Sequence, residues 1–347
     1  MKAKTFIILL SIITLSSFVN GQQRFFRIEN IKGGNEFSFP VLYSQTADSQ
    51  AAAIINQHIQ LSELELLKKH SSDDIFEKIA QDNGTIYGGK VSISYDVFAN
   101  TQNILSLKFT EASCGATCNY WSQFYTFNSG NGDAIELKDI FSSQGFKAFR
   151  TYANAKCSNY LRKEFIKKDS IGLEDTASIL ECYQNSELDD YFIKGSSIFI
   201  DGEHCLMKYQ RFLGLDMITE FKLDEFKDYL NDYGRAIFAP LHDAIAQYRS
   251  ASLPQLFEGS IGESNSIIFI MRHSFDDRIV GLYAYLKYGT GIYLEGNLNN
   301  QRLSLTEKDE NFNDNAYIDA TFDGERIIGT WKNKDKSKTI RFFAKRR

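Results

Sequence analysis

The sequence predicts an α+β fold, in which an antiparallel meander sheet with packed helices is followed by a second, small all-β barrel or sandwich. Three alternating apolar runs lie between residues 91 and 128, with helical patterns before and after them. From residue 256 onward, short strand-like runs recur roughly every ten residues, separated by Gly and Asn or Asp turns. An aromatic content of 14% with only three prolines also suits a chain rich in strands.

Residues 1–21 have the pattern of a signal peptide. A short basic start leads into the apolar run Phe6–Val19, and small residues precede the expected cleavage after Gly21. The run is shorter than the roughly 20 apolar residues of a membrane anchor, and it breaks at Asn20. We therefore expect an exported protein, periplasmic or secreted, that is soluble and has no transmembrane anchor after cleavage.

Residues 22–234 carry the α+β pattern. Two short runs at 24–31 and 36–43 predict a hairpin around a Lys-Gly-Gly-Asn turn, and Pro40 places its second strand at a sheet edge. The elements expected after it are a helix over 51–69, a helix beginning at Asp73, meander strands over 91–99, 104–112 and 119–128, a mostly helical stretch over 144–185, strands over 190–200 and 213–223, and a short helix over 224–234.

Residues 235–255 hold two of the three prolines and predict a connecting linker with one helix. Residues 256–347 predict a small antiparallel β domain, because each strand alternates and so has one buried and one wet face. Its expected strands are 256–262, 266–274, 279–288, 291–299, 302–308, 317–324, 326–333 and 338–345.

Five cysteines lie in this chain, at positions 114, 118, 157, 182 and 205. The pair Cys114 and Cys118 is spaced neither like the C-x2-C pairs of zinc sites nor like those of thiol oxidoreductases. In an exported chain, this pair favours a disulfide that closes the intervening loop. Cys157 and Cys182 lie in neighbouring helical segments and are the second predicted pair, which leaves Cys205 unpaired.

Several classes of function are disfavoured. A net charge of −5 spread over the chain gives no basic footprint for nucleic acid. No short catalytic motif is present, and the five histidines, His58, His70, His204, His242 and His273, are scattered. His58 belongs to a helical apolar stripe, which favours a packed histidine over a ligand. We therefore expect no catalytic residues and no cofactor.

The segment 309–320 partly matches a calcium loop. Asp309, Asn311 and Asn313 fit its first three ligand positions, but Asp314 stands where Gly is needed and Ala320 where a bidentate Glu is needed. A solvated turn is therefore favoured, and we expect no metal site.

Aromatic residues directly after the Cys114–Cys118 loop give the remaining functional signal. Alternation places Trp121, Tyr125 and Phe127 on one face of a strand, which is the better candidate for the core. The rim of the loop then presents polar and amphipathic groups to a sugar or protein partner. The predicted binding residues are Gly115, Ala116, Thr117, Asn119, Tyr120 and Trp121.

Residues 36–230 resemble a bacterial extracytoplasmic α+β domain. The likeness rests on Ile55-Asn56 in a helix, a Gly-Ala loop at 115–116, and the run IELKDIF ending at Phe141. This domain forms the ectodomain of the lysozyme-sensing anti-sigma factor and precedes the catalytic domain of some secreted polysaccharide deacetylases. The β-rich tail is similar to small β-barrel tails of secreted bacterial proteins, and it is too short for a deacetylase module.

Two departures from that family limit what the resemblance implies. Cys114 and Thr117 flank the Gly-Ala pair where the family loop reads Gly-Gly-Ala-His, so the role of that histidine is not carried over. A Pro-Tyr-rich stretch before the last strand is also missing. The sequence thus predicts a non-enzymatic binding protein for a peptidoglycan-like envelope polysaccharide or a secreted protein such as lysozyme. The alternatives are an envelope hydrolase whose site is assembled only in the fold, with His204 or His242 beside acids, and a structural accessory protein of an envelope complex.

Overall fold

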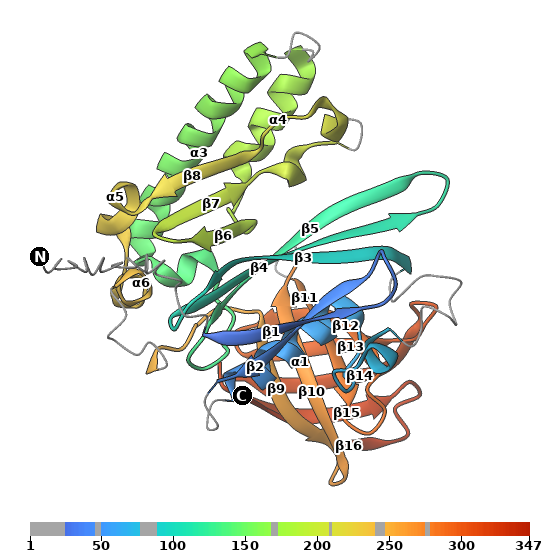
Figure 1. The fold of residues 1–347 in the computed structure, drawn as a ribbon. Helices are drawn as coiled ribbons and strands as arrows, with labels where there is room; N and C mark the ends of the chain where they lie inside the picture. The colour runs from blue at the N-terminus through green and yellow to red at the C-terminus, as the bar shows by residue number, and fades with distance from the viewer. Residues whose placement is uncertain are drawn as a thin grey trace, which may run out of the picture.

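The computed structural model describes residues 25–45, 50–76, 89–167, 173–207, 210–239, 247–274 and 278–347. Three antiparallel sheets and four larger helical segments precede a closed barrel at the C-terminal end of the chain (Figure 1). The fold is therefore α+β with a small all-β domain, as the sequence predicts. The expected signal peptide and His242 lie outside the described residues.

The predicted hairpin and meander are both present. The hairpin pairs β1 (Phe26–Lys32) with β2 (Ser38–Ser44), and Pro40 faces Asn30 in its register. The meander is a three-stranded sheet in the order β3, β4, β5. Its strands are β3 (Lys90–Asn100), β4 (Ile104–Cys114) and β5 (Cys118–Asn128).

The first helix ends earlier than its apolar stripe predicts. Helix α1 spans Ala51–Leu64, and Glu65 then takes a left-handed backbone conformation with φ of 50°. The next residues pair with a turn of the barrel, where the Leu67 amide donates to the Gly289 carbonyl at 2.7 Å. Tertiary pairing thus ends the helix. The next helix, α2, is a single turn over Ser72–Ile75.

A second lobe packs its own sheet against two long helices (Figure 1). Helices α3 (Ser143–Lys167) and α4 (Leu173–Asn185) cover a sheet in the order β6, β7, β8. The remaining elements of this lobe are β6 (Tyr191–Lys194), β7 (Ser197–Asp201), β8 (Ile218–Lys222), α5 (Leu223–Phe226), α6 (Asp232–Phe238) and the 3-10 turns η2 (Leu137–Ile140), η3 (Glu203–Cys205), η4 (Gln210–Leu213) and η5 (Lys227–Tyr229).

The meander sheet has an apolar core on each face. On one face, Phe109, Tyr125 and Phe127 pack with β1, β2 and α1. On the other face, Ile104 joins the core built by α3, α4 and β6–β8. Trp121, which alternation places with Tyr125 and Phe127, is only half-buried, because β5 extends beyond the core toward its hairpin tip.

All eight strands expected after residue 256 are present, and they close into a barrel in which β16 pairs with β9. A closed barrel rather than a sandwich leaves no sheet edge unpaired. The barrel strands are β9 (Gln255–Ile261), β10 (Asn265–His273), β11 (Arg278–Tyr285), β12 (Gly291–Asn299), β13 (Arg302–Lys308), β14 (Asp314–Phe322), β15 (Arg326–Asn333) and β16 (Thr339–Arg346).

The barrel is joined to the α+β region by apolar and ionic contacts. Ile54 and Leu61 of α1 pack against β9, β10 and β11 on the outside of the barrel. In β16, the Arg346 guanidinium lies 2.8 Å from the carboxylate of Asp133, and both side chains are buried. None of the helices in the described ranges has the length and apolar character needed to cross a membrane.

Candidate functional site

The predicted recognition loop lies at the tip of the β4–β5 hairpin. Cys114 and Cys118 form a disulfide there, with the two sulfurs 2.04 Å apart, which confirms the predicted clip. The side chains between them and that of Asn119 are exposed, and 53% of Tyr120 is accessible to solvent. Trp121 is half-buried. The structure therefore brings the six predicted binding residues together at the hairpin tip, where all of them except Trp121 are exposed.

The second predicted disulfide is wrong. Cys182 pairs with Cys205, with the sulfurs 2.01 Å apart, and Cys157 is a buried free thiol. Cys157 faces the apolar core of the lobe near Tyr183 and Thr219, and burial raises the pKa of its thiol. Cys205 lies on η3, which packs against α4 and brings its sulfur to Cys182.

A cleft lies where β5, the segment 134–138, the chain before β6 and barrel strand β10 meet. It consists of two hollows of about 200 and about 760 Å³. Five side chains line both hollows: Gln123, Glu136, Asp189, Arg272 and His273. This cleft leaves no signal in the sequence, because its walls come from segments far apart in the chain. Ligand sites often occupy such junctions between domains.

His58 of α1 forms part of the inner wall of this cleft. The side chain is 1% exposed, and its ring lies edge-on to Phe127 at a centroid distance of 5.1 Å. Burial lowers its pKa to about 3, which outweighs the opposing effect of Glu63, so the imidazole is neutral near pH 7. The Nε2 atom has no hydrogen-bond partner within the described part of the protein. His58 is thus packed in the core, as its place in the apolar stripe of the helix predicts. Its ring also gives the inner wall of the cleft a polar group.

The outer wall of the cleft carries charges of both signs. The Glu136 carboxylate forms an ion pair with the Lys138 ammonium at 2.6 Å, although burial raises the pKa of the Glu136 carboxyl. Burial and the neighbouring Asp190 likewise raise the pKa of Asp189. Arg272 reaches the same space from the barrel. The cleft can therefore bind groups of either charge and polar groups without charge.

A buried polar network supports α1 and β5 behind this wall. Tyr125 donates a hydrogen bond to Glu63, and Lys90 lies 3.3 Å from Glu63 and 2.6 Å from Glu111. Burial and the adjacent Glu63 raise the pKa of Glu111 to about 8. Burial opposes ionisation of Glu63 too, but Lys90 and hydrogen bonds from its neighbours outweigh it and lower the pKa. Lys90 thus lies between two carboxyls, of which Glu63 has a lowered pKa and Glu111 a raised one.

One group of possible metal ligands, around His204, occurs in the part of the chain that the structure describes. His204 donates to Asp190 at 2.9 Å, and it is not among the residues that line the cleft. Cys182, His204 and Cys205 lie within 4.8 Å of one another, but a disulfide removes both sulfurs as thiolate ligands.

The calcium-like segment is a turn. Asp309 accepts hydrogen bonds from the backbone amides of Asn311 at 2.9 Å and Asn313 at 2.8 Å, which closes the connection between β13 and β14.

No family of known proteins matches the sequence, and no curated protein matches it. Among solved structures, the crystal structure of a DUF3298 family member from Bacteroides fragilis is similar over 62% of this chain and 94% of that chain, with a TM-score of 0.39 and 10% identity. A likeness this distant establishes neither a shared fold nor a shared function. The resemblance to the anti-sigma factor ectodomain and to deacetylase N-terminal regions stays a prediction.

Proposed function

We propose that this is an exported, non-enzymatic binding protein that holds a peptidoglycan-like envelope glycan in the cleft between β5 and β10. The observation that carries the proposal is the lining of the cleft. A hollow of about 760 Å³ is lined by the ring of Phe146 and by charged side chains of both signs, acidic Glu136, Glu187 and Asp189 and basic Lys138 and Arg272. Peptidoglycan offers matching groups, because its sugars carry hydroxyls and its stem peptides carry carboxylates and amines.

Co-sedimentation with purified insoluble peptidoglycan tests this proposal. The mature chain, residues 22–347, should sediment with it, and Arg272→Ala should weaken binding by about tenfold, or about 1.4 kcal/mol. Arg341→Ala is the matched control, since it removes the same charge from an exposed position of β16 outside the cleft. Equal binding by both variants and the parent chain would contradict the cleft assignment.

A hydrolase is the alternative class, and the same samples test it. Release of reducing sugars or soluble fragments during incubation, abolished by Glu136→Gln, would show that the protein acts chemically on the glycan. With a binding protein, the glycan stays intact over the same period. His242 lies outside the described residues, so its proximity to an acid is untested.

A secreted protein such as lysozyme is the second candidate ligand, and the open edge of β5 favours it. Tyr120 and Thr126 direct their carbonyls to this edge, where they accept hydrogen bonds from Arg211 and the Ile135 amide. The backbone groups of Ser122 and Phe124 lie on the same edge between them. A partner strand can add to such an edge.

Capture of lysozyme by the immobilised mature chain separates this candidate from the first. Tyr120→Ala, and the double change Cys114→Ser/Cys118→Ser, should reduce capture of a protein partner and leave peptidoglycan binding in the cleft unchanged. Unaltered capture by both tip variants would exclude the hairpin as the protein-binding edge.

A further inference from the structure

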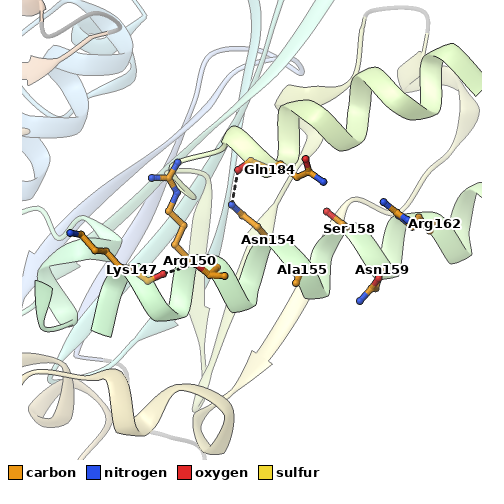
Figure 2. A pocket seen from close by; sticks show the side chains of 9 residues that line it. Lys147, Arg150, Asn154, Ala155, Ser158, Asn159, Arg162 and Gln184 are labelled. Carbon is orange, nitrogen blue, oxygen red and sulfur yellow. Dashed lines mark hydrogen bonds between the residues drawn. The ribbon is translucent and has the colours of Figure 1, made fainter. Parts of the chain in front are cut away.

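A groove runs along α3 beside the end of α4, in the lobe away from the barrel. It has a volume of about 580 Å³, and Figure 2 shows its lining side chains following one another along α3 below Gln184 of α4. Their spacing of three or four residues places them on one helix face. Lys147 and Arg162 mark its two ends, about 22 Å apart at 1.5 Å per residue. The groove is therefore elongated along α3.

The groove is basic, although the chain as a whole has a net charge of −5. None of the described residues that line it is acidic. Among the described residues, no carboxylate forms an ion pair with Lys147 or Arg162. Arg150 is held in place, because it donates to the Ser186 carbonyl at 3.0 Å and pairs with Glu187 at 2.9 Å. The two ends thus offer free cations to an anionic ligand.

The middle of the groove holds buried polar atoms without partners. Ser158 is 6% exposed, and its Oγ forms no hydrogen bond within the described chain. Asn154 donates from Nδ2 to the Gln184 carbonyl at 3.0 Å, while its Oδ1 has no partner there (Figure 2). Unpaired buried polar atoms are costly, so a ligand that pairs them gains affinity. An amide oxygen pairs with a donor such as a hydroxyl, and not with an anion.

We infer that this groove binds an acidic polysaccharide. Its carboxylates or phosphates would meet Lys147 and Arg162, and its hydroxyls would meet Asn154 and Ser158. The separation of the two cations requires a polymer with repeated charges, since a single small anion cannot span it. This inference does not depend on the glycan proposed for the cleft, because the two sites share no lining residue.

Affinity electrophoresis of the mature chain in gels containing defined polymers tests the inference. Alginate supplies carboxylates with sugar hydroxyls, a phosphomannan supplies phosphates with sugar hydroxyls, dextran supplies hydroxyls alone, and poly-glutamate supplies carboxylates alone. Retardation by alginate or the phosphomannan, well above that by dextran and poly-glutamate, supports the inference and identifies the anion. If neither alginate nor the phosphomannan retards the protein, the inference is wrong. Equal retardation by poly-glutamate overturns the requirement for a sugar.

Three variants locate the binding. Lys147→Glu/Arg162→Glu should weaken it by about tenfold, because both terminal charges are reversed. Ser158→Ala should weaken it by about threefold, because one hydrogen bond is lost. Lys163→Glu/Lys334→Glu makes the same charge change outside the groove, and it should change the affinity for the polysaccharide by no more than about twofold. Equal losses in the two charge-reversed variants would mean nonspecific attraction and overturn the site. Arg272→Ala should weaken binding of peptidoglycan in the cleft and leave binding of the acidic polysaccharide unchanged. Thermal unfolding of each variant checks that it is folded.

Discussion

The barrel closes on itself, whereas the meander sheet β3–β5 ends in two edge strands. The barrel contains no cysteine, and its buried carboxylate, Glu307, accepts hydrogen bonds from the neutral donors Tyr283 at 2.6 Å and Trp331 at 3.1 Å. The α+β region holds all five cysteines, two disulfides and the ion network around Lys90.

The two regions are therefore held together in different ways. A closed sheet pairs the backbone hydrogen-bonding groups of every strand and leaves no open edge. The meander leaves the outer edges of β3 and β5 open, and the groove lies separately, along α3 and the end of α4. Disulfides cross-link this region at the hairpin tip and between α4 and η3. The candidate binding sites accordingly lie on or beside the α+β region. The two tryptophans, Trp121 and Trp331, report one region each, so the comparison can be measured.

The largest effect is expected for Asp133→Ala, which breaks the tie between the two regions. The change removes the carboxylate 2.8 Å from the buried Arg346 and leaves it only the longer contact with Glu325 at 3.7 Å, at a cost of about 3–5 kcal/mol. Urea unfolding in single-tryptophan backgrounds should then give two separate transitions, because the regions lose their ionic link. Asp319→Ala, which breaks the half-exposed pair with Lys332, is the control and should cost at most about 1 kcal/mol. If the Trp121 and Trp331 transitions coincide in the variant and little stability is lost, the Asp133–Arg346 ion pair does not couple the two regions.

Removal of the Cys182–Cys205 disulfide should destabilise the α+β region alone. The two cysteines are 23 residues apart, and loop-closure entropy predicts a loss of about 3 kcal/mol for Cys182→Ser/Cys205→Ser. The Trp121 transition should move to lower urea, and the Trp331 transition should move less. A matching shift of both would show that the barrel also depends on this cross-link. Reducing agent added to the parent chain provides an independent check.

A smaller loss is expected at the hairpin tip. The Cys114–Cys118 loop is short, with a separation of 4, so Cys114→Ser/Cys118→Ser should cost about 2 kcal/mol at most. The change should mainly loosen the exposed tip and weaken capture of a protein partner. If unfolding and partner capture are both unchanged, the disulfide has no role in shaping a recognition edge.

The smallest effect is a pH dependence that arises from Glu111. Its pKa is raised in the folded protein, so its contribution to stability is complete below the ordinary value of 4.5 and is lost as the pH rises through about 8. Unfolding followed by Trp121 should show stability falling over this range by at most about 1.4 kcal/mol per pH unit. Glu111→Gln should flatten the profile, since the amide does not ionise. Glu181→Gln, at an exposed position of α4, is the control, and an equal slope in both variants would contradict the assignment.

Prediction from sequence succeeded where the signal is local. Alternation located all eight barrel strands and the meander, and the spacing of Cys114 and Cys118 indicated their disulfide. It failed for Cys205, because η3 has no strong periodic pattern and reaches α4 only through the packing of the lobe. It also placed the end of α1 too late, since pairing of Leu67 with Gly289 of the barrel ends that helix.

The sequence alone determined the order and type of most elements, because side-chain alternation and helical stripes depend on near neighbours in the chain. Only the tertiary structure decided that the last eight strands form a barrel, that Cys205 pairs with Cys182, and that Arg272 and Glu136 line one cleft. These features depend on how separate elements pack. Contacts between distant residues leave no periodic trace in one sequence, so burial, pairing and cleft formation appear only when the whole chain is folded.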